Sequence, residues 1–242
     1  MAGWNPGARS DIVAAVNRHE FGRGLRAGLP ITIGYLPMAV AFGIVARSAG
    51  IGLAETTGMS VFVFAGASQF MAAELVASGV HPASIVLATL VLNFRHFLMS
   101  THLGRRLRPG RAASLAVGFV VTDETYVVGS LEPELTPSFF LGLGLAAWSG
   151  WLAGTVIGAA AAQAIPDFLA RSMAVTLFAM FIALLVPAVR ARWQRGIVAG
   201  LAALIAWAAS RFIPSLEAGW RIVVAMLAAS AVSIALPMED EE

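Results

Sequence analysis

Eight apolar segments, separated by short polar joints, run through this chain of 242 residues. They cover residues 27–48, 57–78, 83–103, 112–129, 138–163, 172–189, 196–213 and 219–236. A helix of about 20 residues, at about 1.5 Å each, matches the ~30 Å hydrocarbon core of a bilayer. Hydrophobic residues make up 58% of the chain and charged residues only 12%. The pattern predicts an all-α polytopic membrane protein with about seven to eight transmembrane segments.

The joints between the apolar segments are too short to hold a soluble domain. We therefore expect residues 25–237 to form a single transmembrane domain. Residues 1–24 are polar with scattered apolar positions and lack the apolar core of a signal peptide, which predicts a segment on the membrane surface. Residues 238–242 form an acidic tail, to which we assign no chemistry.

Arginine clusters in the joints give conflicting topology signals. The clusters at residues 9–26, 105–111 and 190–195 are each expected on the cytoplasmic side. Three simple spans between successive clusters would place neighbouring clusters on opposite sides. Either some segments do not cross the membrane, or arginine placement misleads here. The two blocks of three segments, residues 27–103 and 112–189, also leave open an inverted repeat, a common transporter plan.

The first two segments contain residues that interrupt helices. Pro30, Gly34 and Pro37 lie in the first segment, and Gly66 begins a Gly-Ala-Ser-Gln run in the second. Proline removes a backbone hydrogen bond, and glycine weakens a helix locally. Broken helices at membrane depth occur only where they are buried in protein or line a cavity. We therefore predict that both helices are broken.

The third segment carries polar side chains at its centre. Thr89, Asn93, His96 and Ser100 fall at i, i+4, i+7 and i+11, which places them on one helix face. Arg95 points about 100° away from His96. A positive charge at the middle of a span costs at least ~2.5 kcal/mol, so these residues are candidates for a substrate path. In the alternative, they tie helices together and Arg95 forms a structural ion pair.

Acidic residues in the apolar segments are the candidates for proton coupling or for binding an ammonium group. Asp123 and Glu124 are adjacent, and such a pair is costly unless it is protonated or meets a cation such as Arg95. In the alternative, both lie near the end of a short segment, in headgroups or water. Glu74 is the third candidate, at a depth that the sequence does not fix.

Ser68 and Gln69 follow Gly66 at the predicted break in the second segment. Freed backbone groups and the positive end of a half-helix can bind a ligand carboxylate there. A Gly-x-Ser sequence with a distant membrane histidine is also found in intramembrane serine proteases. Gln69 stands where such a motif has a second glycine, and no other protease signature is present, so we disfavour an enzyme.

Several classes of site are not expected from the sequence. The chain has no cysteine, and its four histidines show no metal-ligand spacing. There is no Gly-x-x-x-x-Gly-Lys phosphate loop for ATP, and a net charge of +2 indicates no nucleic-acid partner. We expect no metal and no cofactor, with the lipid bilayer as surroundings.

Four motifs occur in order, namely GLPITIGYLPMAVAFGIVARSAG, FAGASQFMAAEL, NFRHFLMS and TDETY. Together they resemble the AzlC family of branched-chain amino acid exporters, over roughly residues 21–190. The resemblance implies export of leucine, isoleucine and valine across a bacterial inner membrane. It also implies a second, small membrane subunit of the AzlD type.

In the first hypothesis the protein is an exporter of small apolar amino acids, with substrate between the broken helices and the polar stripe. Its carboxylate would bind Ser68 and Gln69 or Arg95, and its ammonium would bind Asp123 or Glu124. The proton gradient or an outward substrate gradient would supply the energy. The alternatives are a passive channel for a small polar or anionic solute, and an assembly subunit without a path.

Overall fold

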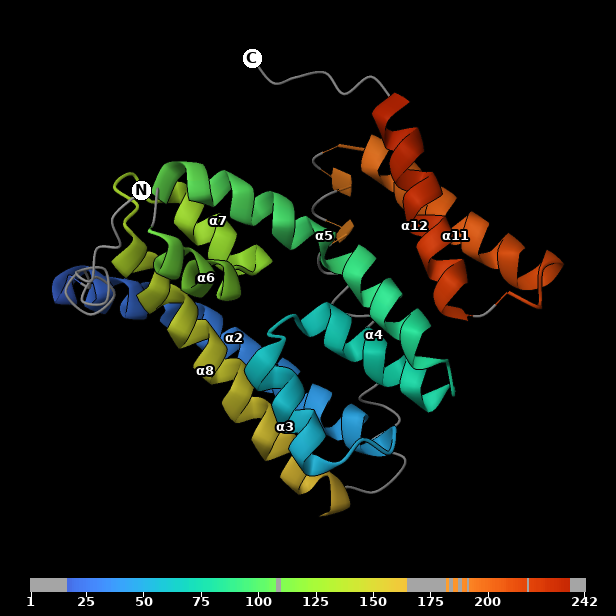
Figure 1. The fold of residues 1–242 in the computed structure, drawn as a ribbon, viewed down its shortest axis with the longest axis horizontal. Coiled ribbons are helices and arrows are strands. Elements are labelled where there is room, and N and C mark those ends of the chain that lie inside the picture. Colours follow the sequence, from blue (N-terminus) through green and yellow to red (C-terminus); the bar gives the residue numbers. More distant parts are fainter. Residues whose placement is uncertain are drawn as a thin grey trace, which may run out of the picture. The chain divides into compact units, whose positions relative to one another are not determined.

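The computed structural model describes residues 17–107, 110–164, 192–216 and 218–235, together with a few single residues between 182 and 190. Every regular element in these ranges is a helix (Figure 1). The chain divides into two compact units, described here where their residues are described. The first comprises Met1–Gly43, Leu53–Gly66 and Phe94–Ala160, and the second comprises Ile44–Gly52, Ala67–Asn93 and Ala161–Glu242.

Four of the described helices are long and apolar enough to cross a membrane. They are α2 (Arg18–Ser48), α5 (Pro82–Leu107), α8 (Pro137–Ala161) and α11 (Gln194–Phe212). They correspond to the first, third, fifth and seventh predicted segments, and α12 (Ala218–Ala235) corresponds to the eighth. Most of the sixth predicted segment, residues 172–189, lies outside the described residues.

The second and fourth predicted segments are each divided into two short helices. The second gives α3 (Leu53–Phe62) and α4 (Gly66–Ala77), which confirms the predicted break. The fourth gives α6 (Arg111–Phe119) and α7 (Asp123–Leu131), a break that was not predicted. Helices of nine to twelve residues extend about 13–18 Å, well short of the ~30 Å hydrocarbon core. None of the four can cross a bilayer alone.

The predicted break in the first segment is wrong, because α2 continues through Pro30 and Pro37. Membrane helices tolerate proline where neighbouring helices and Ser or Thr side chains compensate. Here the Thr32 hydroxyl lies 3.1 Å from the Gly28 carbonyl in its own helix and 2.8 Å from the Ala146 carbonyl of α8. This contact with α8 supports α2 between its two prolines.

Helices α2 and α8 pack closely and run parallel within the first unit. A Cβ atom added to Gly142 would lie 2.2 Å from the Phe21 carbonyl oxygen. A Cβ atom added to Gly158 would lie 2.1 Å from the Val40 carbonyl oxygen. Residue numbers thus increase together along both helices, which shows that the helices are parallel. Glycine at these positions is what permits the two backbones to approach.

One end of the first unit collects the termini of several helices. Arg23 near the start of α2 binds the Glu132 carboxylate at 2.9 Å, just after the end of α7. Arg106 near the end of α5 donates to the Glu132 carbonyl at 2.9 Å. The Asn17 backbone N–H, just before α2, donates to the Ser138 hydroxyl at the start of α8, over 3.0 Å. Helices α2 and α8 therefore begin where α5 and α7 end.

This arrangement removes the conflict between the first two arginine clusters. Arg23 belongs to the first cluster and Arg106 to the second, and both contact Glu132. The described parts of both clusters, which include Arg23 and Arg106, therefore lie at the same end of the unit. The second segment, which the prediction counted as one simple span between these clusters, is a pair of short helices.

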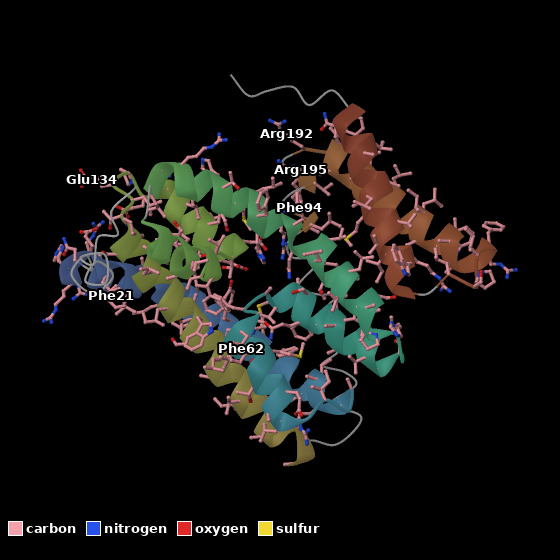
Figure 2. The ribbon with its side chains drawn as sticks, in the orientation of Figure 1. Phe21, Phe62, Phe94, Glu134, Arg192 and Arg195 are labelled. Carbon is pink, nitrogen blue, oxygen red and sulfur yellow. The ribbon has the colours of Figure 1, made fainter. Side chains whose placement is uncertain are left out.

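The first unit has an apolar core and an apolar outer surface. Phe62 and Phe94, which are 80% and 59% exposed, lie on that surface (Figure 2). The core next to α6 and α7 consists of Leu103, Leu107, Val117, Val120, Val121, Phe139, Phe140 and Leu143. In the second unit Leu75 of α4, Ala88 of α5 and Val223 of α12 form a core, and α11 packs against α12. Large exposed apolar side chains fit a lipid environment.

Candidate functional site

The break between α6 and α7 is built by the sequence Thr122-Asp-Glu-Thr125. Thr122 is the N-cap of α7, and its hydroxyl accepts the Thr125 backbone N–H at 3.3 Å. The Thr125 hydroxyl accepts the Thr122 backbone N–H at 2.8 Å, which completes a capping box. Asp123 and Glu124 occupy the first turn, where the helix dipole favours negative charge. The motif therefore starts a helix in an otherwise apolar run.

Arg95 of α5 forms an ion pair with Asp123 at the start of α7. The guanidinium nitrogen Nη1 lies 2.8 Å from Asp123 Oδ2. The two side chains are 36% and 32% exposed, so the pair is partly accessible. The buried Nε of Arg95 has no hydrogen-bond partner in the described part of the chain. Asp123 thus compensates the charge of Arg95, which would be costly alone in a membrane, and the Nε group of Arg95 is left as a donor for another acceptor.

Glu124 contacts a different group, the hydroxyl of Tyr35 from α2. Tyr35 donates to Glu124 Oε2, and its oxygen also lies 2.9 Å from the Thr122 hydroxyl. Only 7% of Tyr35 is exposed, and its ring makes edge contacts with Phe64 at 6.2 Å and Trp151 at 5.5 Å. Tyr35 was missed from sequence, because nothing local in α2 indicates a contact with α7.

His96 lies beside Arg95 on α5 and is half-buried. Its imidazole lies within electrostatic range of both Arg95 and Glu124. Two adjacent residues of α5 are thus near two adjacent carboxylates of α7. Further along the same helices, the Tyr126 hydroxyl lies 2.9 Å from His102 Nδ1. The polar contacts between α5 and α7 therefore extend beyond the break.

The predicted polar stripe of α5 lies on a partly buried face. The Thr89 hydroxyl lies 2.9 Å from the Ile85 carbonyl of its own helix. The Asn93 amide donates to the Ser68 hydroxyl of α4 at 3.0 Å, and its buried Oδ1 has no hydrogen-bond partner among the described residues. Ser100 is half-buried towards the end of α5. Asn93 and Ser68 both belong to the second unit.

The other predicted polar residues lie on α4. Ser68 and Gln69 are each only 1% exposed, in the first turn of this helix. Glu74 is exposed on the same helix, in the second unit. The carboxylate that pairs with Arg95 is that of Asp123, in the first unit. Asp123, and not Glu74, is therefore the ion-pair partner of Arg95.

Of the four predicted helix-break residues, only Gly66 begins a helix. A Cβ atom added there would lie 2.7 Å from the Trp151 ring atom Cη2. A Cβ atom added to Gly34 would meet nothing within 4 Å. Close packing against an indole therefore explains glycine at position 66, whereas Gly34 has no comparable constraint.

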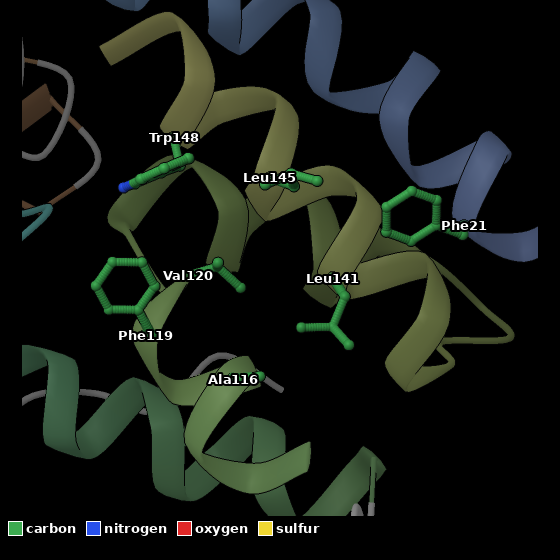
Figure 3. A pocket seen from close by; sticks show the side chains of 7 residues that line it. All are labelled: Phe21, Ala116, Phe119, Val120, Leu141, Leu145 and Trp148. Atoms are coloured by element: carbon green, nitrogen blue, oxygen red, sulfur yellow. The ribbon is translucent and has the colours of Figure 1, made fainter. Parts of the chain in front are cut away.

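Aromatic side chains continue from this region to an apolar pocket. Phe64 lies 6.2 Å from Phe119, which lies 6.5 Å from Trp148. The pocket has a volume of about 360 Å³ and an apolar lining (Figure 3). Its lining residues are Phe21, Ala116, Phe119, Val120, Leu141, Leu145 and Trp148. Residues of α2, α6 and α8 thus line an open apolar hollow beside the break.

Comparison with known proteins places this chain in a family. A family model described as AzlC protein matches residues 30–165, which include Tyr35, Arg95 and Glu124. An uncharacterized membrane protein of Archaeoglobus fulgidus is 32% identical over 189 residues, 77% of this chain and 84% of that protein. Inner membrane protein YgaZ of Escherichia coli is 31% identical over 148 residues, 57% of this chain and 60% of YgaZ.

A third relative is the branched-chain amino acid transport protein AzlC of Bacillus subtilis. It is 26% identical over 134 residues, which cover 54% of this chain and 53% of that protein. No solved structure matches the chain. The family model covers more than half of the sequence and contains the polar site between α5 and α7. The resemblance is thereby confirmed, and the chain belongs to the AzlC family.

Proposed function

We propose that this protein exports leucine, isoleucine and valine across a bacterial inner membrane. In this proposal it is the large subunit of a two-component exporter, and the second subunit is a small AzlD-type membrane protein. The name of the Bacillus subtilis relative supports the substrate class, and that of YgaZ supports the location. Four helices long enough to cross a membrane support a transmembrane path.

The observation that carries the proposal is the partly exposed ion pair of Arg95 and Asp123 at the break between α6 and α7. An amino acid zwitterion carries one carboxylate and one ammonium group. Arg95 can bind the carboxylate through two parallel N–H donors, and Asp123 can accept from the ammonium. Substrate binding would replace the Arg95–Asp123 ion pair with two pairs, one between Arg95 and the substrate carboxylate and one between Asp123 and the substrate ammonium. All four charges would then stay paired, and an unpaired charge is costly inside a membrane.

The aromatic side chains beside the break are the proposed contacts of the aliphatic side chain. Phe64 and Phe119 lie 6.2 Å apart, and Tyr35 is the next ring along at 6.2 Å from Phe64. Each buried CH₂ group contributes roughly 0.8 kcal/mol. Such contacts would favour leucine over alanine, and the preference would grow with the number of CH₂ groups in the substrate side chain. They would not require hydrogen bonding to that side chain.

For topology, we propose that α2, α5 and α8 cross the membrane and that α6 and α7 form a re-entrant hairpin. The parallel packing of α2 and α8, with the end of α5 beside the start of α2, supports an alternation of these three helices. The arginine-rich end would be cytoplasmic by the positive-inside rule. The Thr122–Glu124 tip would then lie near the middle of the bilayer, about 14 Å from the start of α6.

The order of helices supports an inverted repeat with bounds that differ from the predicted blocks 27–103 and 112–189. A long helix, α2, is followed by the short pair α3 and α4, and the long helix α5 is followed by the short pair α6 and α7. Within the first unit, α5 ends where α2 begins, so these long helices run in opposite directions. Inverted-topology repeats with discontinuous helices are common in transporters.

We also propose a role for the polar residues around the start of α4. The hydrogen bond from Asn93 to Ser68 and the burial of Gln69 support a part in fixing that helix start. His96 and Ser100 would complete the polar face of α5 along the substrate path in the first unit. The proton gradient is the proposed energy source, with a carboxylate at the α6–α7 break as the coupling group.

The test is export of labelled leucine, isoleucine and valine from cells that lack the protein, complemented with the full chain, with and without its small partner. We expect saturable export that requires both subunits. Non-saturating flux without preference among amino acids would instead support the passive channel. Normal export by an Arg95→Gln variant at wild-type abundance would contradict the proposed binding site.

A further inference from the structure

The two carboxylates that begin α7 have different neighbours. Asp123 pairs with the Arg95 guanidinium at 2.8 Å. Glu124 accepts from the neutral hydroxyl of Tyr35, and no ion pair to Glu124 within 4 Å is found among the described residues. A permanent cation thus compensates Asp123, whereas the partner of Glu124 carries no charge.

A continuous chain of hydroxyl groups leads away from Glu124. The Tyr35 oxygen lies 2.9 Å from Thr122 Oγ1, which lies 3.3 Å from Thr125 Oγ1. Thr125 Oγ1 in turn lies 2.9 Å from the Val120 carbonyl. Each hydroxyl has one donor and can accept two hydrogen bonds. The chain can therefore be polarised in either direction by rotating hydroxyl hydrogens.

Both protonation states of Glu124 fit this chain without movement of heavy atoms. With Glu124 ionised, Tyr35 donates to it and Thr122 can donate to Tyr35. With Glu124 protonated, the carboxylic acid donates to Tyr35, Tyr35 to Thr122, and Thr122 to Thr125, which donates to the Val120 carbonyl. Every hydroxyl hydrogen has an acceptor in both states. This matters because an unmade hydrogen bond of a buried group is costly.

The groups that face Glu124 come from three helices. Tyr35 approaches from α2, His96 and Arg95 from α5, and Asp123 from α7 itself. Helix α8, whose Trp151 packs against Tyr35, contains no titratable side chain. His96, the second residue of α5 in this group, is half-buried.

We infer that Glu124 is the proton-binding carboxylate of this protein and that Tyr35 is the positioning residue that holds it in both protonation states. One proton binds the Glu124 carboxylate to form an O–H group and later leaves as a proton, with no other bond made or broken. Asp123 stays paired with Arg95 or with the substrate ammonium. The coupling role rests on the proposed transport function, whereas the proton binding does not.

The experiment is an infrared pH titration of the full chain in membranes. A protonated carboxylic acid has a carbonyl stretch that is absent from the carboxylate. The chain has fourteen acidic side chains, and among the bands that titrate in the wild type we expect one to be lost in Glu124→Gln and to persist in Asp123→Asn. In Tyr35→Phe the band should shift, because its hydrogen-bond partner is lost. Tyr126→Phe, which alters the second of the chain's two tyrosines, should leave the band in place.

Persistence of the band in Glu124→Gln, or its loss in Asp123→Asn when equal amounts of protein are compared, would overturn the inference. Since Glu124→Gln preserves side-chain shape, it decides the question even if Tyr35→Phe fails to reach the membrane. Leucine transport is the second measurement. Glu124→Gln should retain leucine exchange and lose the pH dependence of net export. Absence of leucine transport in the wild type contradicts the proposed function alone, because the infrared titration does not depend on substrate.

Discussion

The guanidinium of Arg95, in a long apolar helix, lies 2.8 Å from the carboxylate of Asp123 at the start of a short one. A helix that carries an arginine in an apolar stretch needs a compensating charge, and Asp123 provides it. The same pair is partly exposed, which a purely structural ion pair does not require. The structural role of the ion pair can therefore be distinguished from its role in transport by neutralising Arg95 and Asp123 one at a time and then together.

Neutralising one member of the pair should reduce the amount of protein in the membrane. In Arg95→Gln or Asp123→Asn the remaining charge loses its partner, at a cost of order 2.5 kcal/mol or more in a bilayer. The double variant has no unpaired charge, so it should accumulate like the wild type. Its leucine export should nevertheless be lost. Immunoblotting of membranes and export assays measure the two effects, and a double variant that exports normally would assign the pair a structural role only.

Adding a side chain at Gly66 should destabilise the protein. The Cβ atom of Gly66→Ala would lie 2.7 Å from the Trp151 ring, and overpacking of this kind costs roughly 1–3 kcal/mol. Gly34→Ala is the matched control, because its Cβ atom meets nothing within 4 Å and alanine favours a helix. Thermal unfolding in detergent should show a lower midpoint for Gly66→Ala only. Equal midpoints for the two variants would argue against this packing.

The contact between α2 and α8 should be sensitive to small substitutions. Gly158→Ala would place a Cβ atom 2.1 Å from the Val40 carbonyl oxygen, which is backbone and cannot rotate away. Gly22→Ala, on the neighbouring helix, meets nothing within 4 Å. We expect a clear loss of folded protein on size-exclusion chromatography for Gly158→Ala and little change for Gly22→Ala. A well-folded Gly158→Ala protein would contradict the close parallel packing.

The proposed topology can be tested with single cysteines, since the chain contains none. Gly110→Cys, before α6, and Glu134→Cys, after α7, should both resist a membrane-impermeant maleimide added to intact cells. Ser48→Cys, at the far end of α2, should be labelled. All three positions are exposed in the structure. If Gly110→Cys and Glu134→Cys differ in accessibility, α6 and α7 together cross the membrane and are not re-entrant.

Much of the helical architecture could be predicted from apolar segment length. The long helices α2, α5, α8 and α11 follow it directly, and the Gly-Ala-Ser-Gln run marked the start of α4. Local signals failed in α2, where Pro30 and Pro37 suggested a break. Whether a proline interrupts a membrane helix depends on its neighbours, and here α8 packs along the same stretch.

The break before α7 was missed because residues 120–122 contain neither proline nor glycine. Its signal was present as Thr122 followed by Asp123 and Glu124, which is typical of a helix start. The site itself was only partly predictable. Arg95 and Asp123 stand out as charges in apolar runs, whereas the contact of Tyr35 with Glu124 depends on how α2 packs against α7.

Substrate binding by this ion pair is tested most directly by leucine counterflow in proteoliposomes that contain the full chain and its small partner. We expect saturable uptake of labelled leucine against preloaded leucine, with competition by isoleucine and valine. We also expect loss of uptake in the Arg95→Gln/Asp123→Asn double variant at equal protein content. Undiminished counterflow in that variant would contradict the claim that this ion pair binds the substrate.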